Sequence, residues 1–337
     1  MIIVLKPKAS RTQVEAVIRE VRNLGYKPHP IIGVERTVVA AIGDERTHQT
    51  LETLLAMPWV DQVMPVQRRY KLVSREGHPK TSVIRVGKRE IGGKRVQIMA
   101  GPCSVESERQ IVDTARAVKK AGAAFLRGGA FKPRTSPYDF QGLKEDGLKL
   151  LSLARQETGL LIVTEVLSEA DVDLVARYAD ILQIGARNSQ NFALLIAAAE
   201  SGKPILLKRG MSMRMEEWFF SAEYILSRGN PNVILCERGI RTFETMTRNT
   251  LDLSAVALAK TETHLPVIVD PSQAVGRADM VSTLCKAAIA TGADGLIIEV
   301  HPDPKQAMSD GAQQMTPRQF EIMMRELKPF IHAAGRC

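Results

Sequence analysis

From residue 95 onward, short apolar runs alternate eight times with stretches of helical pattern. The runs read "VQIMAGPCS", "AAFLRGG", "LLIVTEV", "ILQIGAR", "PILLKRG", "VILCERG", "PVIVDPS" and "GLIIEVH". Near-continuous apolar strands are typical of a parallel sheet that is buried on both faces. Eight strand–helix units in about 250 residues predict a closed (β/α)₈ barrel over 95–337, an α/β fold, with a doubly wound open sheet as the alternative.

Residues 1–67 carry a different pattern. A strand in "MIIVLK" precedes a helix for which Ser10 is the expected N-cap and Gly25 lies just past the end. The remaining segments predict two strands, a helix and a strand: "YKPHPIIG", "RTVVAAIG", "THQTLETLLAM" and "VDQVMPVQ". The order βαββαβ is that of a small ferredoxin-like domain. This unit is too short to be a catalytic core, and its sequence has no evident nucleophile or metal cluster.

Residues 68–94 are polar and basic. Their charge predicts a solvated linker, which runs into a small hairpin around Val83–Ile91.

Composition narrows the function. No apolar run approaches the roughly 18 residues of a membrane helix, and the first residues lack a signal-peptide plan, so we expect a cytoplasmic protein. The four cysteines are scattered, which favours neither a disulfide framework nor a zinc knuckle. The net charge is +9, yet aromatic residues make up only 5% and the notable bases sit singly at strand ends. This pattern favours a phosphorylated or carboxylated metabolite over nucleic acid or a membrane surface.

Each of the eight apolar runs ends in a polar, charged or metal-capable residue. In chain order these are Cys103, Arg127, Glu165, Arg187, Lys208, Arg238, Asp270 and Glu299. In a barrel, the carboxyl ends of the strands carry the chemistry. So many charges at one mouth would repel each other or lack partners unless ligands join them. The sequence therefore predicts a ligand site at this end.

Five of the cations form a predicted anion-binding cup: Arg127, Lys132, Arg187, Lys208 and Arg238. Arginine suits a bidentate grip on phosphate or carboxylate, and lysine a point-charge contact. A second group, Cys103, Glu299 and Asp310, offers a thiolate and two carboxylates to a divalent transition metal. The alternatives are a buried apolar cysteine, a loop glutamate and an aspartate that only forms a turn.

Several motifs together resemble 3-deoxy-D-arabino-heptulosonate 7-phosphate (DAHP) synthases, in particular the subtype with an N-terminal ferredoxin-like domain. They are "AGPCS", "LRGGAFKPRTSPYDFQG", "QIGARN", "LLKRG", "CERGIRTFE", "TRNTLD", "VDPS" and "IIEVHPDP". The resemblance covers the whole chain. It implies condensation of phosphoenolpyruvate with erythrose 4-phosphate, the entry step to aromatic amino acids. Octulosonate 8-phosphate synthases resemble the chain less, because their corresponding loop lacks "PRT".

The resemblance also implies residue roles. The five cup residues would hold phosphoenolpyruvate, while Arg134 and Thr135 would bind the phosphate of the aldose. Glu165 and Asp270 fall in the same substrate-binding set. Lys132 would donate a proton to the aldehyde oxygen, with metal-bound water as its rival, and Arg127 and Lys208 complete the expected catalytic set. A homotetramer is expected, and tyrosine or phenylalanine is the expected feedback inhibitor at the N-terminal domain.

One position departs from the family pattern. After the seventh strand the family has Asp-Pro-Ser-His with the histidine as a metal ligand, whereas this chain has Gln273 in its place. The resemblance therefore implies a divalent metal (Mn, Fe, Co or Zn) held by Cys103, Glu299 and Asp310, with the fourth ligand weak or lost. A catalytically impaired, substrate-binding relative and an octulosonate synthase are the competing hypotheses.

Overall fold

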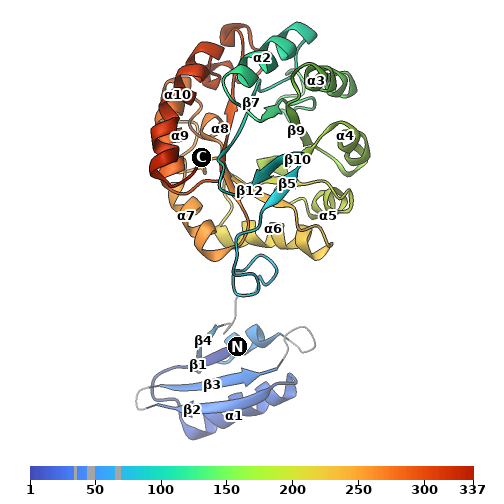
Figure 1. Ribbon diagram of the computed structural model, residues 1–337. Coiled ribbons are helices and arrows are strands. Elements are labelled where there is room, and N and C mark those ends of the chain that lie inside the picture. Colours follow the sequence, from blue (N-terminus) through green and yellow to red (C-terminus); the bar gives the residue numbers. More distant parts are fainter. Residues whose placement is uncertain (34–35, 44–49, 65–69) are drawn as a thin grey trace. The chain divides into compact units, whose positions relative to one another are not determined.

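The computed structural model describes residues 1–33, 36–43, 50–64 and 70–337 (Figure 1). The chain divides into two compact units, Met1–Arg69 and Tyr70–Cys337.

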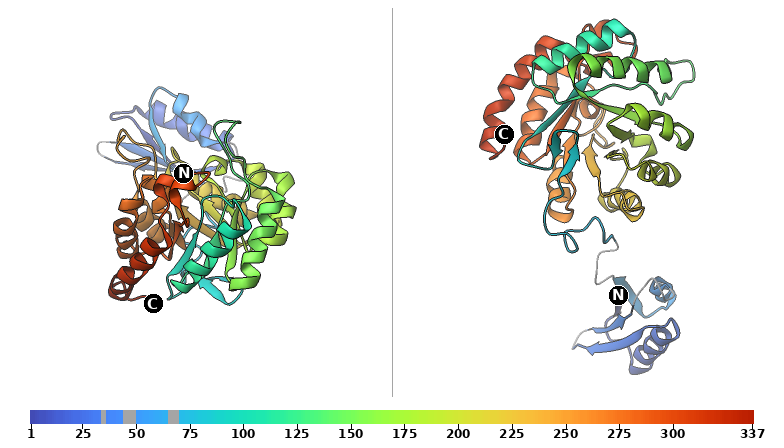
Figure 2. Two further views of the ribbon diagram at one scale, coloured as in Figure 1. Left: turned by 90° about the horizontal axis from the view of Figure 1, so that it is seen from above. Right: turned by 45° about the vertical axis from the view of Figure 1, so that its right-hand side comes forward.

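The first unit is a four-stranded antiparallel sheet with the helix α1, Arg11–Asn23, packed along it (Figures 1 and 2). Its strands are β1 Ile2–Leu5, β2 Lys27–Ile32, β3 Thr37–Ile42 and β4 Val60–Met64. The order β2-β3-β1-β4 places the first strand of the chain inside the sheet, between β3 and β4. This is the arrangement of a ferredoxin-like domain, and it confirms the predicted fold of this unit.

Helix α1 begins and ends where the sequence predicts. Ser10 caps it, with Gln13 completing a reciprocal capping box, and Gly25 just past its end has a φ of 95°. The buried residues Val14 and Val17 lie one turn apart on the face that packs against the sheet.

The second predicted helix differs from expectation. Within the described residues it is a 3₁₀-helix, η1, spanning Leu51–Ala56, and 47–49 of the predicted helix lie outside the described residues. Leu51 and Leu54 are both fully buried. A spacing of three residues places both on one side of a 3₁₀-helix, which has three residues per turn. Thr50, at its start, provides no side-chain cap.

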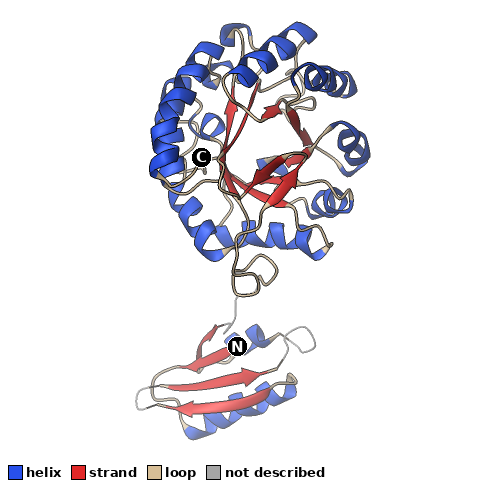
Figure 3. Ribbon diagram, viewed as in Figure 1, coloured by secondary structure: helices blue, strands red, loops and turns tan. Residues whose placement is uncertain are grey.

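The second unit contains the predicted barrel, which is confirmed as a closed ring of eight parallel strands (Figure 3). The strands are β7 Gln97–Gly101, β8 Phe125–Arg127, β9 Leu161–Val166, β10 Ile181–Ile184, β11 Ile205–Lys208, β12 Val233–Glu237, β13 Val267–Val269 and β14 Gly295–Glu299. All eight are fully or almost fully buried, as expected for a sheet covered on both faces.

A ring of helices surrounds these strands in Figure 3. They are α2 Glu108–Lys120, α3 Glu145–Thr158, α4 Val172–Tyr178, α5 Phe192–Glu200, α6 Met215–Ser227, α7 Leu253–Glu262, α9 Ala278–Ala290 and α10 Pro317–Ala333. The short helix α8, Pro271–Val275, directly follows β13 and lies inside this ring. Short 3₁₀ turns are η2 Glu169–Asp171, η3 Ala186–Asn188, η4 Pro304–Gln306 and η5 Gly311–Gln313. Among the described residues, no helix combines the length and apolarity needed to span a bilayer.

The predicted hairpin is confirmed as β5 Ile84–Val86 and β6 Arg89–Ile91. Its apolar side chains share one buried cluster with Phe125 and Ile181, the first residues of β8 and β10. The hairpin therefore covers the amino-terminal end of the barrel. This leaves the carboxyl ends of the strands free for a site.

The prediction of a solvated linker is wrong for residues 70–75 and for Ser82, which are packed against or bonded to the barrel, whereas residues 76–80 are exposed as expected. The Glu223 carboxylate on α6 accepts hydrogen bonds from the three successive backbone N–H groups of 71–73, each at 2.9 Å. The Tyr70 ring packs edge-on against Phe219, and Ser82 Oγ lies 2.7 Å from His264 Nδ1. The residues of the barrel that bind this basic segment are far from it in the sequence. They come close to it only in the folded chain, so the sequence pattern did not predict these contacts.

Candidate active site

The predicted strand-end residues lie at the carboxyl end of the barrel. Arg127, Lys208 and Glu299 are the last residues of β8, β11 and β14, and Glu165 is the last but one of β9. The other four follow their strands within three residues: Cys103, Arg187, Arg238 and Asp270. The barrel therefore places all eight around one mouth.

A pocket opens at this mouth, with about 880 Å³ of space between protein atoms, part of it continuous with solvent. The predicted residues that line it are Arg127, Lys132, Arg134, Thr135, Glu165, Arg187, Lys208, Arg238, Gln273 and Asp310. The other three, Cys103, Asp270 and Glu299, are buried and contact lining residues from behind.

Two cations of the cup are paired with buried carboxylates. Lys208 Nζ lies 2.6 Å from Asp270 Oδ2, and Arg127 Nη1 lies 2.9 Å from Glu299 Oε1. Burial disfavours the Arg127 cation, yet the facing Glu299 carboxylate raises the pKa of Arg127 above its ordinary value. The expectation that these charges would lack partners without a ligand is therefore wrong for these two pairs.

Other donors of the cup remain without partners. Among the described residues, the buried Nε of Arg127 has no hydrogen-bond partner, and exposed Arg187 has neither a hydrogen bond nor an ion pair. Buried N–H donors are normally satisfied, because leaving one unpaired costs about 1–3 kcal/mol. An anion in the pocket would offer acceptors to this side of the site.

The loop after β8 brings Lys132 under the pocket. Lys132 Nζ donates to the Cys103 carbonyl at 2.9 Å and lies 3.0 Å from Cys103 Sγ. A Cβ at Gly129 would lie 2.8 Å from Lys132 Cδ and 2.9 Å from the Cys103 carbonyl oxygen. Glycine at 129 is thus what lets the lysine side chain fold back beneath its own loop.

The same loop supplies the outer side of the pocket. Arg134 is partly buried and Thr135 exposed, and both line the pocket. Arg134 Nη2 lies 3.1 Å from Asp139 Oδ2 of the same loop. Because Asp139 is largely exposed, this pair is weak and its arginine can exchange it for a ligand anion.

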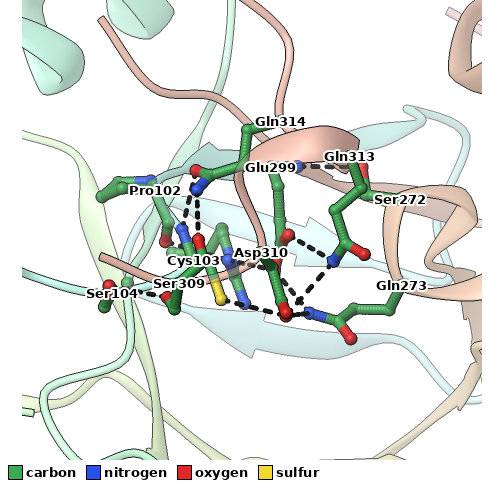
Figure 4. A network of polar contacts seen from close by, with 12 residues as sticks. Pro102, Cys103, Ser104, Ser272, Gln273, Glu299, Ser309, Asp310, Gln313 and Gln314 are labelled. Carbon is green, nitrogen blue, oxygen red and sulfur yellow. Dashed lines mark hydrogen bonds and ion pairs between the residues drawn. The ribbon is translucent and has the colours of Figure 1, made fainter. Parts of the chain in front are cut away.

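The predicted metal-ligand residues come together (Figure 4). One ligand atom from each of Cys103, Glu299 and Asp310 lies within 4.8 Å of the other two. A sulfur and two carboxylate oxygens in this spacing fit a divalent transition metal in both ligand type and distance. These residues could therefore hold such an ion.

Cys103 and Asp310 of this cluster differ in charge. Burial, and next the Glu299 carboxylate, raise the pKa of the Cys103 thiol to about 11. Burial also opposes ionisation of Asp310, but the nearby cations of Arg248 and Lys132 outweigh it and bring the Asp310 pKa to about 2. At neutral pH Cys103 is therefore a thiol beside the ionised Asp310, so a metal must displace the thiol proton.

Gln273 lies beside this cluster with its amide nitrogen towards the carboxylates. Gln273 Nε2 donates to Glu299 Oε1 at 2.7 Å and to Asp310 Oδ2 at 3.1 Å. The Asp270 carboxylate caps the first turn of α8 at the Gln273 N–H, which fixes the backbone of this residue.

Sequence reasoning missed two residues of the site. Gln313 Nε2 donates to Glu299 Oε2 at 2.6 Å, and Arg248 Nη1 lies 3.3 Å from Asp310 Oδ2 and lines the pocket. Asp310 itself adopts a left-handed backbone with a φ of 50°, which is rare for a residue with a side chain. Arg248 lies in the "TRNTLD" motif and Gln313 follows Asp310 by three residues, so both were adjacent to recognised signals.

The sequence matches the DAHP synthetase I family over residues 79–333. This chain belongs to that family. Residues 1–68 match the DAHP synthase ferredoxin-like domain, so the likeness to the family extends through both units.

Two of the comparisons match this chain over almost its whole length. It is 49% identical over 335 residues to the phospho-2-dehydro-3-deoxyheptonate aldolase of Thermotoga maritima, which covers 99% of each chain. A crystal structure of the Thermotoga maritima DAHP synthase has a TM-score of 0.94 at 48% identity, covering 99% of this chain and 98% of that one. A truncated form from the same organism matches 79% of this chain and 98% of its own, with a TM-score of 0.74 and 49% identity.

Octulosonate enzymes are more distant. The 2-dehydro-3-deoxyphosphooctonate aldolase of Caulobacter vibrioides is 32% identical over 269 residues, covering 74% of this chain and 91% of its own.

Proposed function

We propose that this chain condenses phosphoenolpyruvate with erythrose 4-phosphate to give DAHP and inorganic phosphate, the first step of the shikimate pathway. The observation that carries the proposal is one pocket with an inner set of cations at the strand ends and a further cation, Arg134, nearer its entrance. Two anionic substrates need two such cationic regions. The 49% sequence identity to a DAHP synthase over 99% of both chains supports the same reaction.

The inner set suits phosphoenolpyruvate, which carries a carboxylate and a phosphate. In our proposal Arg127, Lys132, Arg187, Lys208 and Arg238 hold these two groups. The donors of Arg127 and Arg187 that have no partner within the described part of the chain support this assignment. Glu165 also lines this inner part, and a Cβ at Gly185 would lie 1.9 Å from its carboxylate oxygen, so the glycine keeps that wall open.

The second cationic region suits the aldose phosphate. Arg134 and Thr135 would bind it at the pocket entrance, while the aldehyde end reaches inward towards Lys132. Charge-assisted bonds of this kind fix orientation as well as affinity. Holding two reactants in a reactive geometry provides a large part of the reduction in activation free energy at such a site.

The bond changes then follow in order. Carbon 3 of phosphoenolpyruvate attacks the aldehyde carbon, and the carbonyl oxygen takes a proton, for which buried Lys132 is the proposed donor. Water adds to the cationic carbon 2, and one of its protons restores the Lys132 ammonium group. The carbon 2–oxygen bond to phosphate then breaks while the new hydroxyl passes its proton to the phosphate, which leaves a ketone and inorganic phosphate. Arg127 and Lys208 stabilise the charge that collects on the departing phosphate.

Cys103, Glu299 and Asp310 are the residues that would hold a divalent metal, with manganese, iron, cobalt and zinc as candidates. When bound, such an ion supplies Lewis-acid polarisation and orientation of the aldehyde. We infer weak binding because Gln273 stands where the family has an imidazole ligand, and its amide presents N–H donors, which cannot ligate a metal, to the two carboxylates.

The decisive experiment measures initial rates of phosphoenolpyruvate consumption by the full chain. Erythrose 4-phosphate and arabinose 5-phosphate are compared, each after chelation and during manganese titration. We expect turnover with the four-carbon aldose that rises with manganese. Preference for the five-carbon aldose would favour an octulosonate synthase. No turnover at any manganese concentration would favour the impaired relative.

We also infer that the first unit is regulatory, binding tyrosine or phenylalanine in a homotetramer. A chain that starts at Tyr70 is the suitable truncation, because residues 71–73 and Ser82 bind the barrel. The second unit is compact by itself, and the structure of a truncated relative has been solved. We expect inhibition of the full chain only. Equal inhibition of both chains, or of neither, would contradict a regulatory role, and light scattering tests the tetramer.

A further inference from the structure

Two glutamine amides bridge the same pair of carboxylates (Figure 4). Gln273 Nε2 joins Glu299 Oε1 to Asp310 Oδ2 at 2.7 and 3.1 Å. Gln313 Nε2 joins Glu299 Oε2 to the same Asp310 oxygen at 2.6 and 3.4 Å. An amide nitrogen thus lies between the two carboxylates, where a shared cation would bind.

An arginine holds the oxygen of each amide. Arg238 Nη2 donates to Gln273 Oε1 at 3.4 Å, and also to the Gln273 backbone carbonyl at 3.1 Å. Arg248 Nη1 donates to Gln313 Oε1 at 2.9 Å. Turning the Gln273 amide over would place its oxygen against two carboxylates and its N–H₂ group against a guanidinium, which has only donors. The neighbours on both sides therefore hold Gln273 with its donor towards the cluster.

We propose that Gln273 competes with the metal instead of ligating it. The proposal rests on the proposed function in one respect, that Cys103, Glu299 and Asp310 are the metal ligands. An ion can reach the carboxylate pair only after both Gln273 hydrogen bonds break. The carboxylates also have Arg127 and Arg248 as ion-pair partners, so a metal finds their charge already compensated.

The competitor at the pocket surface is Gln273, since it lines the pocket and is partly exposed, whereas Gln313 is buried behind the carboxylates. The consequence has a definite sign. If Gln273 were a ligand through its oxygen, removing it would weaken metal binding. Because it is a competitor, removing it strengthens metal binding.

The experiment measures Mn²⁺ affinity of the full chain from the EPR signal of free Mn²⁺. Gln273→Leu fills the space without a donor or a ligand, and Gln273→Ala leaves room for water. Gln190→Ala, at an exposed glutamine, is the matched control. We expect both Gln273 variants to bind Mn²⁺ about tenfold more tightly than the parent, since hydrogen bonds to charged groups typically contribute that much or more. The control should equal the parent.

A second readout places the ion. Adding Asp310→Ala to Gln273→Leu should abolish the tight binding, and Mn²⁺ should raise the melting temperature of Gln273→Leu more than that of the parent. Circular dichroism verifies that each variant is folded, and Gln273→Ala decides the sign if Gln273→Leu is not. Weaker or unchanged Mn²⁺ binding in the folded variants would overturn the proposal, as would binding that survives loss of Asp310. If the affinities shift as expected but the chain does not condense its proposed substrates, only the proposed function fails.

Discussion

The two sides of the pocket satisfy their charges in opposite ways. On the anion side, carboxylates pair with Lys208 and Arg127 from behind, while Arg187 has no side-chain partner among the residues that the structure describes. On the carboxylate side, amides and arginines already occupy Glu299 and Asp310. Donors without partners can bind a ligand directly. Carboxylates that already have hydrogen bonds and ion pairs must first lose them before they can bind a metal. Anion binding should therefore be strong without metal, and metal binding weak without a change of sequence.

The largest expected effect comes from Lys132, which joins the two sides by contacting Cys103 from within the cation cup. Lys132→Met should lower kcat by roughly 10²–10⁴, because the proposed proton donor is lost. Steady-state kinetics measure the change, and Lys149→Met on the exposed face of α3 is the control. A kcat close to that of the control would remove Lys132 from the chemistry.

Lys208 tests whether the pairing behind the cup stabilises the fold. Lys208→Met leaves Asp270 buried without its cation, which typically costs about 3–5 kcal/mol of unfolding free energy. Urea denaturation should show this loss for Lys208→Met but not for Arg187→Ala, since Arg187 is exposed. Equal stabilities of the two variants would mean that the pair contributes no more to the fold than a surface charge.

Arg187→Ala should weaken phosphoenolpyruvate binding by about 1.5–3 kcal/mol, the usual contribution of a charged hydrogen bond. Calorimetry after chelation measures the dissociation constant without any contribution from metal. The parent should bind phosphoenolpyruvate under these conditions. If chelation abolished binding by the parent, the two sides of the pocket would not be independent.

Arg134→Ala should act on the other substrate. The Michaelis constant for erythrose 4-phosphate should rise about tenfold, the loss of one partly exposed charged bond, while that for phosphoenolpyruvate changes little. Equal increases in the two constants would place Arg134 in the shared interior of the pocket and not at its entrance.

The smallest effect is expected for Gln273→His. The substitution removes the competing amide and adds an imidazole nitrogen, so Mn²⁺ binding should tighten at least as much as in Gln273→Leu, while turnover in buffer without added metal should rise only several-fold. Titration of Mn²⁺ into chelated protein measures both. Unchanged metal dependence would show that the residue at 273 does not set the affinity of the carboxylate side.

The sequence predicted the barrel and its strand-end residues because each apolar run has a clear end, and parallel strands in a barrel bring those ends together. Lys208 and Asp270 lie 62 positions apart, so their pairing depends on closure of the ring. Gln313 lies in a 3₁₀ turn without apolar periodicity, and Arg248 in the long segment between β12 and α7, so no pattern placed either one. The attachment of residues 71–73 depends on Glu223, about 150 positions away.

The orientation of the Gln273 side chain could not be predicted from the sequence either. Gln273 was recognised as a departure from the family pattern, but whether its amide would present oxygen or nitrogen depends on Arg238 and the two carboxylates around it. Arg238 directly follows β12, Glu299 ends β14, and Asp310 lies in the segment after β14, just before η5. Their distances are a product of the folded barrel.

The central claim is that this pocket forms a carbon–carbon bond between phosphoenolpyruvate and erythrose 4-phosphate. Phosphoenolpyruvate labelled with ¹³C at carbon 3, supplied with erythrose 4-phosphate labelled with ¹³C at carbon 1, allows NMR to follow that bond directly in the full chain with Mn²⁺. We predict that the vinyl signal is replaced by a methylene signal coupled to the former aldehyde carbon, with one inorganic phosphate released per product. Conversion to labelled pyruvate alone, or coupling only when arabinose 5-phosphate is supplied, would contradict the account.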